Sequence, residues 1–289
     1  MFKPTFPCAV TLGGIILAAS LLLVTAGLLQ AADESVREQE QSKGRLELMQ
    51  QTIARLEAAP SEKLGKGALA FVAKPLLRYS DPTRGTTEAN VLLDATVWRL
   101  GEKGRPTALV TLEIYRASEE NRILAYEFLS LSPAKISLKH KEREKVTWNA
   151  AGDALPMKPL PEAPKPAPNA TARLVQMRQL ARRFTAREKI KSGDVQCRLL
   201  SQPIDRYQSE EEKIVDGAIF VYANGTNPEL GVLLECNVKE WSYGVARLTS
   251  AESKVELDGK EVATFLHGDF GLKREGNYTS TSHPLLTNE

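Results

Sequence analysis

The chain has 289 residues, of which 42% are hydrophobic and 26% are charged, and its formal net charge at pH 7 is +2. So small a total is uninformative by itself, because the charge is unevenly distributed along the chain, and we expect no nucleic-acid partner. Beyond an apolar N-terminal stretch, about 255 residues remain, which suffices for one large or two small domains.

Residues 1–32 have the pattern of an export segment. Lys3 precedes an uncharged apolar run from Cys8 to Leu29, and acidic residues follow from Asp33. The run fits a signal peptide cut near Ala26. At roughly 20 residues it fits an uncleaved anchor in the inner membrane equally well. Under both alternatives we predict an extracytoplasmic protein, periplasmic or secreted.

The next part, residues 45–151, is predicted to be a helix followed by strands. After a polar spacer at residues 33–44, apolar residues from Leu46 to Leu56 recur at helical spacing, and Pro60 ends the helix. Because the later connections are short, the strands should pair antiparallel as a meander. They are expected at Ala68–Tyr79, Ala89–Leu100, Thr107–Arg116, Ile123–Leu131 and, more weakly, around Ile136 and Val146.

A proline-rich linker at residues 152–170 leads to a second part at residues 171–266. Apolar residues from Leu174 to Phe184, flanked by arginines, predict a second helix over Thr171–Glu188. Residues 267–289 have no periodicity, and we predict a disordered tail. Strands are expected at Val195–Gln202, Ile214–Asn224, Glu229–Val238 and Trp241–Thr249, with a final hairpin over Lys254–Thr264.

The two parts resemble each other. DATVWRLGEKGRPTALVTLE at Asp94–Glu113 matches DGAIFVYANGTNPELGVLLE at Asp216–Glu235 with a constant offset of 122 residues, and PLLRY before the first matches PIDRY before the second. Such a repeat indicates an internal duplication. We therefore predict an α+β fold of two tandem units, each an amphipathic helix packed on a four- to five-stranded antiparallel meander sheet.

Polar residues kept in both copies form the candidate cluster. In a hairpin centred on the Gly101–Arg105 loop, Glu113 falls within about a residue of Asp94, so two carboxylates and an arginine should share a region of each sheet. A carboxylate pair can perform acid–base chemistry. We prefer a structural ion pair, because a shared scaffold is the simplest reason for one set to appear twice, and we predict no catalytic residue. The set is Arg78, Tyr79, Asp94 and Glu113, with Arg206, Tyr207, Asp216 and Glu235.

Cys197 and Cys236 are the only cysteines after the export segment, and outside the cytoplasm they are candidates for a disulfide. Each stands where the first copy has an aliphatic residue, so a pair of buried thiols fits equally well. The histidines have no partner at ligand spacing, and we expect no metal and no cofactor. They are His140, in a charged run read as a solvated turn, His267 and His283.

The stretch Thr171–Lys191 holds seven basic residues and one acidic residue. As a helix it would present a basic face to an anionic membrane surface. Neutralisation of the acidic residues in the second copy is the interpretation we prefer. The residues of this face are Arg173, Arg178, Arg182, Arg183 and Arg187.

Several segments together resemble one family. They are PLLRYSDPTRG, a D-A-x-x-W strand, YEFLSLS, RQLARRF and DGAIFVYANGTNPE, and they span most of residues 65–265. In this respect the chain is similar to a family of uncharacterised exported proteins from planctomycete bacteria. The resemblance implies an envelope location and brings no activity, ligand or catalytic residue.

These patterns favour a non-enzymatic extracytoplasmic protein that binds a ligand or organises the envelope, with an envelope protein or polymer as partner. One alternative is a cone-shaped α+β hydrolase or isomerase with a carboxylate-lined pocket, which a deep pocket holding the duplicated Asp and Glu residues would favour. A second alternative is a membrane-surface adaptor that uses residues 171–191.

Overall fold

The computed structural model describes residues 36–61, 68–81, 91–118, 120–268 and 275–285. The predicted export segment at residues 1–32 lies outside these ranges. The chain divides into two compact units, Met1–Glu47 and Leu48–Glu289. In the first, residues 36–47 are helical and mostly exposed, and the spacer predicted at residues 33–44 stays a prediction. No helix in the described ranges is both long enough and apolar enough to cross a membrane.

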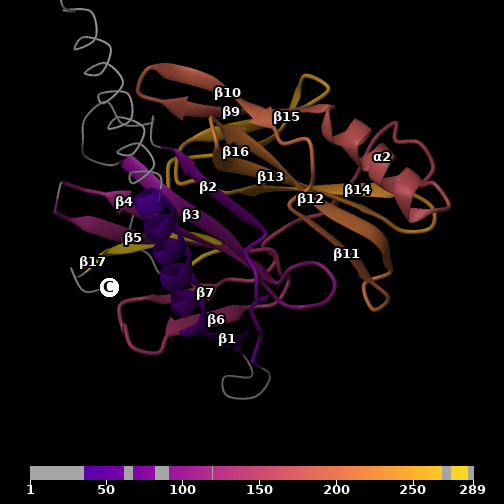
Figure 1. Cartoon of the computed structure of the whole chain (residues 1–289). Helices are drawn as coiled ribbons and strands as arrows, with labels where there is room; N and C mark the ends of the chain where they lie inside the picture. Colours follow the sequence, from indigo (N-terminus) through magenta and orange to yellow (C-terminus); the bar gives the residue numbers. More distant parts are fainter. Residues whose placement is uncertain (1–35, 62–67, 82–90, 119, 269–274, 286–289) are drawn as a thin grey trace, which may run out of the picture. The chain divides into compact units, whose positions relative to one another are not determined.

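The second unit, Leu48–Glu289, is mostly β and contains three antiparallel sheets (Figure 1). The first sheet has the order β1-β6-β7, from Leu56–Pro60, Ile136–His140 and Thr147–Ala150. The second has the order β17-β5-β4-β3-β2, from Tyr278–Leu285, Arg122–Ser130, Ala108–Arg116, Val91–Leu100 and Leu77–Asp81.

The third sheet has the order β16-β15-β9-β10-β12-β13-β14-β8, and β11 also pairs with β12. A helix, α2 (Ala170–Ala181), precedes its first long hairpin; its N-cap is Asn169, whose side chain accepts a hydrogen bond from the Ala172 amide. The strands are Lys260–Phe265, Ser253–Leu257, Phe184–Ile190, Gly193–Leu199, Ile214–Asn224, Asn227–Cys236, Trp241–Arg247 and Lys158–Pro159, with β11 at Asp205–Ser209.

The strand register repeats along the chain. In β3–β4 the cross-strand pairs run from Asp94 with Ile114 to Leu100 with Ala108, and every pair has a counterpart in β12–β13 at 122 residues further on. The next ladder is also equivalent, because the pairs of β4–β5 match those of β13–β14, with an offset of 122 residues for β4 and of 117 residues for β5. Equivalent residues of the two copies therefore face the same way, since register fixes the face of every side chain.

Equivalent faces of the two copies pack against each other. One apolar cluster draws residues from both, and these residues sit at matching positions of β2–β5 and β11–β14. The prediction of an α+β fold in two separate helix-on-sheet units is therefore wrong: the fold is mostly β, and one face of each repeated sheet packs against the other copy. The shared cluster includes Tyr79, Ala95, Val97, Leu109, Leu129 and Leu131 with Tyr207, Ile219, Val221, Leu233, Ala246 and Leu248.

The opposite face of each copy has its own cover. In the first copy, Met49 and Ile53 from the end of the N-terminal helix and strands β6 and β7 pack over β3–β5. In the second copy, Met177 and Leu180 of α2 pack over β12–β14 together with β9 and β15. Helices thus supply only part of each cover, and added strands supply the rest, because a 12-residue helix such as α2 cannot span a sheet of this width.

Three segments differ from their predicted structure. The predicted helix Thr171–Glu188 ends at Ala181, and β9 begins at Phe184. The predicted linker at residues 152–170 includes β8, which pairs with β14, and places Leu160 in the core. The predicted disordered tail includes β17, drawn in yellow beside β5 (Figure 1). In addition, the first helix ends at residue 54, so Leu56 begins β1.

Candidate functional site

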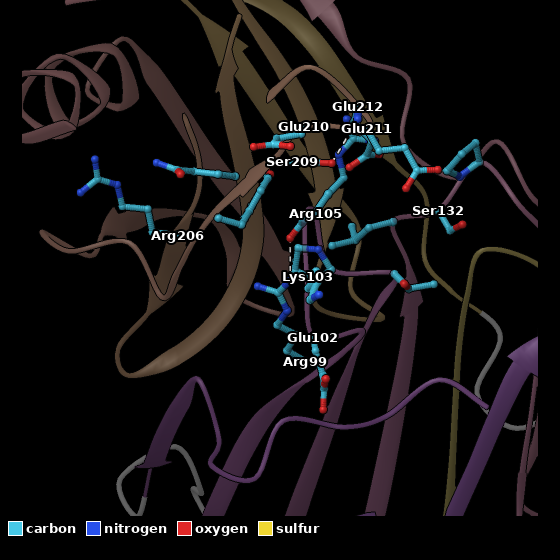
Figure 2. A pocket seen from close by; sticks show the side chains of 17 residues that line it. Arg99, Glu102, Lys103, Arg105, Ser132, Arg206, Ser209, Glu210, Glu211 and Glu212 are labelled. Carbon is cyan, nitrogen blue, oxygen red and sulfur yellow. Dashed lines mark hydrogen bonds between the residues drawn. The ribbon is translucent and has the colours of Figure 1, made fainter. Parts of the chain in front are cut away.

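A cavity of about 720 Å³ opens beside the β3–β4 hairpin and the β11–β12 turn (Figure 2). Arg99 and residues 102–107 line it from the hairpin, residues 131–133 from the segment after β5, and residues 206–212 from β11 and its turn. Both copies therefore contribute to one cavity. The apolar part of its lining comes from Pro106, Leu131, Pro133 and Tyr207.

Arg99 fixes the hairpin turn at the edge of the cavity. Its Nε donates to the Gly101 carbonyl at 2.5 Å and its Nη2 to the Gly104 carbonyl at 2.5 Å, while Nη1 forms an ion pair with Asp205 at 2.7 Å. Gly101 and Gly104 have φ angles of 91° and 66°, which favour glycine. One buried guanidinium thus holds the turn in shape and ties it to β11.

A second ion pair joins the two copies beneath the same cavity. Arg105 Nε and Nη2 lie 2.6 and 2.8 Å from the two carboxylate oxygens of Glu235, and the Tyr207 hydroxyl donates to Glu235 Oε1 at 2.7 Å. Burial and the Glu235 charge raise the pKa of Tyr207 well above its usual value, which keeps the hydroxyl as a donor. The bidentate geometry makes this a strong, directional contact.

The Arg–Asp members of the predicted cluster pair within each copy. Arg78 binds Asp94 with Nε and Nη2 at 2.9 and 2.5 Å, and Arg206 binds Asp216 at 2.8 and 2.6 Å in the same way. Asp216 also accepts a hydrogen bond from Nε of Arg173 in α2 at 2.9 Å, so this carboxylate links the helix to the sheet. Asp216 is fully buried and has three donors, an arrangement that serves structure.

The Tyr–Glu members pair on the other face of each sheet. Tyr79 donates to Glu113 at 3.0 Å, as Tyr207 does to Glu235. Asp94 pairs with Ile114, one residue from Glu113, so the two carboxylates point to opposite faces. Asp94 and Glu113 are thus within one residue of each other in the register, as predicted, but on opposite faces, and none of the duplicated carboxylates lines the cavity.

Two further tyrosines and the carboxylate of Glu127 lie near the Tyr79–Glu113 pair. Tyr115 donates to Glu113 at 2.9 Å, and Tyr278 of β17 donates to Glu127 at 2.7 Å. Burial first, and then the charges of Glu113 and Glu229, raise the pKa of Glu127 well above its usual value. The predicted disordered tail thus supplies a part-buried hydrogen bond.

The predicted basic helix face does not exist as a single surface. Arg173 is buried against Asp216, Arg178 donates to Gln202, and Arg183 pairs with Asp258 at 2.5 Å. Arg182 is the C-cap residue, and Arg187 lies on β9, where the chain is no longer helical. Three of the arginines therefore make separate internal contacts, and Arg182 and Arg187 are exposed on different segments.

Cys197 and Cys236 are both buried, and they are thiols instead of the candidate disulfide. Burial, followed by the nearby Asp216 charge, raises the pKa of the Cys236 thiol to about 11. His140 is 5% exposed on β6, so its reading as a solvated turn is wrong. Within the described part of the chain, no group of three His, Cys, Asp or Glu residues is placed to hold a metal ion.

Comparison with known proteins gives no match among family models, curated proteins or solved structures. The resemblance to exported planctomycete proteins therefore stays a prediction.

The lining of the cavity was not foreseen from the sequence, although a signal for part of it was present. At the offset of 122 residues, Arg99 corresponds to Val221 and Arg105 to Asn227. A charge in one copy at a position that is apolar in the other indicates a contact made by only one copy. Comparing the copies position by position would have singled out Arg99.

Proposed function

We propose that the chain is a binding protein that acts outside the cytoplasm and holds its ligand in the cavity lined by the β3–β4 hairpin and the β11–β12 turn. The observation that supports this most directly is that ion pairs between the two copies fix the wall of the cavity. Arg99 and Arg105 of the first copy each form a buried ion pair with the second copy next to it. A preformed site of this kind avoids much of the ordering cost of binding.

The duplicated carboxylates are committed to structural contacts, which argues against a catalytic role for them. Asp94, Asp216, Glu113 and Glu235 each bind internal arginine or tyrosine donors, and the Asp and Glu of each copy lie on opposite faces of a sheet. A general base needs a carboxylate that reaches the substrate. The extracytoplasmic part of the proposal depends on the apolar pattern of residues 1–32.

A photo-crosslinker placed in the cavity tests this function. Gln208 lines the cavity and is exposed, and Cys197 and Cys236 are buried, so a Gln208→Cys, Cys8→Ser chain carries one accessible thiol for a benzophenone-maleimide. Glu144→Cys in the same background is the matched control, since Glu144 is exposed and outside the cavity lining.

The labelled proteins are irradiated with an envelope fraction of the native host. We expect one adduct from position 208 that is absent from position 144 and that unlabelled wild type competes away. Identical adducts from both positions, or none from position 208, would contradict a ligand site here.

A further inference from the structure

A second cavity, of about 500 Å³, opens beside the end of β14. Arg247, the last residue of β14, lines it together with residues 264–268 at the end of β16, and with Glu275, Tyr278 and Thr279 from around the start of β17. No described residue lines both this cavity and the one beside the β3–β4 hairpin. Its volume is in the range of pockets that hold small ligands.

The guanidinium group of Arg247 is half-buried and is held in place by carbonyl groups and aromatic rings. Nε donates a hydrogen bond to the Thr249 carbonyl at 2.7 Å, and Nη2 donates to the Ala251 carbonyl at 3.2 Å. The central carbon, Cζ, lies 4.6 Å from the centroid of the Tyr278 ring and 5.7 Å from that of the Phe265 ring. Among the described residues, Nη1 has no hydrogen-bond acceptor.

Arg247 also has no carboxylate partner in the described part of the chain. Arg99 and Arg105 of the first cavity each form an ion pair, whereas Arg247 forms none, even with Glu275 in its own cavity. Burial lowers the pKa of Arg247, and the nearby charge of Glu127 offsets this only in part. The side chain remains a cation, and an anion that binds beside it would offset its lost hydration.

The wall of the cavity opposite Arg247 is fixed in position and partly apolar. The Ser250 carbonyl accepts a hydrogen bond from the Gly268 amide at 2.7 Å and another from His267 Nδ1 at 2.9 Å, which ties the segment after β16 to the segment after β14. Phe265 and Leu266 add apolar side chains to the lining. A cavity that is already formed avoids part of the ordering cost of binding.

We infer that this cavity binds a small organic carboxylate. The carboxylate accepts hydrogen bonds from Nη1 of Arg247, and the apolar body of the ligand contacts Phe265 and Leu266. Guanidinium groups form strong charge-assisted hydrogen bonds with carboxylates. A doubly charged phosphate fits less well, because one cation and apolar neighbours do not balance its charge. The inference is independent of the function proposed for the first cavity.

The probe is 4-fluorobenzoate, and its binding to the full chain is measured by fluorine NMR titration. The neutral analogue 4-fluorobenzyl alcohol and inorganic phosphate as a competitor test the need for both a carboxylate and an apolar body. Arg247→Gln removes the cation, and Arg182→Gln makes the same change at an exposed arginine outside the cavity. Leu266→Glu adds a negative charge to the lining, and Val238→Glu is its control, since these side chains are 73% and 71% exposed and Val238 is outside the cavity.

We expect Arg247→Gln to weaken the binding of 4-fluorobenzoate by about tenfold or more, because hydrogen bonds to charged groups contribute at least that factor. Leu266→Glu should weaken binding a few-fold by repulsion, and both controls should leave it unchanged. Thermal unfolding verifies that each variant is folded, and if Arg247→Gln is not, the comparison of Leu266→Glu with Val238→Glu decides.

Four results would overturn the inference. They are the absence of saturable 4-fluorobenzoate binding, equally tight binding of the neutral alcohol, displacement by phosphate at concentrations no higher than that of the probe, and equal effects of a variant and its control.

Discussion

Removing the Arg105 side chain tests whether the buried pair with Glu235 holds the two copies together. In Arg105→Met, two charge-assisted hydrogen bonds of 2.6 and 2.8 Å are lost, and Glu235 keeps only the Tyr207 hydroxyl among its described donors. Each such bond is worth at least about 1.5 kcal/mol. The expected loss is therefore about 3 kcal/mol, which agrees with the lower end for breaking a buried pair.

Urea unfolding at pH 7 measures this loss, with Lys189→Met as the control. The Lys189–Glu252 pair is 3.2 Å long, but its side chains are 58% and 41% exposed, so its removal should cost at most about 1 kcal/mol. In the double variant Arg105→Met, Glu235→Gln, the buried charge disappears with its partner, and much of the loss should be recovered. A loss under about 1 kcal/mol for Arg105→Met, or no recovery in the double variant, would refute this reasoning.

Three other predictions follow from buried groups. The pKa of Glu127 is higher in the folded protein than in the unfolded chain, where it is about 4.3. The free energy of unfolding should therefore fall as the pH rises from this value towards the folded pKa. In urea unfolding, Glu127→Gln should match wild type near pH 4 and be more stable than wild type at pH 8. Gly217→Ala places a Cβ 2.4 Å from the Tyr207 ring and should lower the unfolding free energy by about 1–3 kcal/mol in the same assay. Cys197 and Cys236 should react with a thiol reagent only when urea unfolds the chain, and a fast reaction in native buffer would contradict their burial.

The strands of the repeated hairpins were predictable because their patterns are strong. Alternation between Ala108 and Ile114 predicted β4, and an apolar run predicted β12 at Ile214–Asn224, where the structure places it. The offset of 122 residues also anticipated the equal registers of β3–β4 and β12–β13. Local sequence determines these features, since each hairpin joins neighbours in the chain.

The remaining fold was not predictable because distant contacts determine it. Phe184–Ile190 continues the apolar stripe of α2, so no local signal separates helix from strand; pairing with β10 and β15 makes it β9. β17 is rich in Ser and Thr, and it is ordered by its ladder to β5 and by Tyr278 on Glu127. Tertiary context overrides intrinsic preference at such places.

The candidate cavity was hidden for a related reason. Its residues come from three segments separated by as much as a hundred residues, and only the packing of one copy on the other brings them together. The duplicated residues Arg78 and Asp94 attracted attention because they recur, yet recurrence marked a structural pair. Arg105, which has no counterpart arginine in the other copy, lines the cavity beside Arg206 and Tyr207 of the duplicated set.

The shared apolar cluster has a consequence for any chain that carried only one copy. Such a chain would expose the face around Val97 and Leu129. In the present protein this face is covered by the second copy, through the corresponding residues around Ile219 and Ala246. A surface that is complementary to a second copy of itself forms a dimer with twofold symmetry. A single copy made alone would thus be expected to form a homodimer, and the present chain joins in one polypeptide what two subunits would otherwise have to find by diffusion.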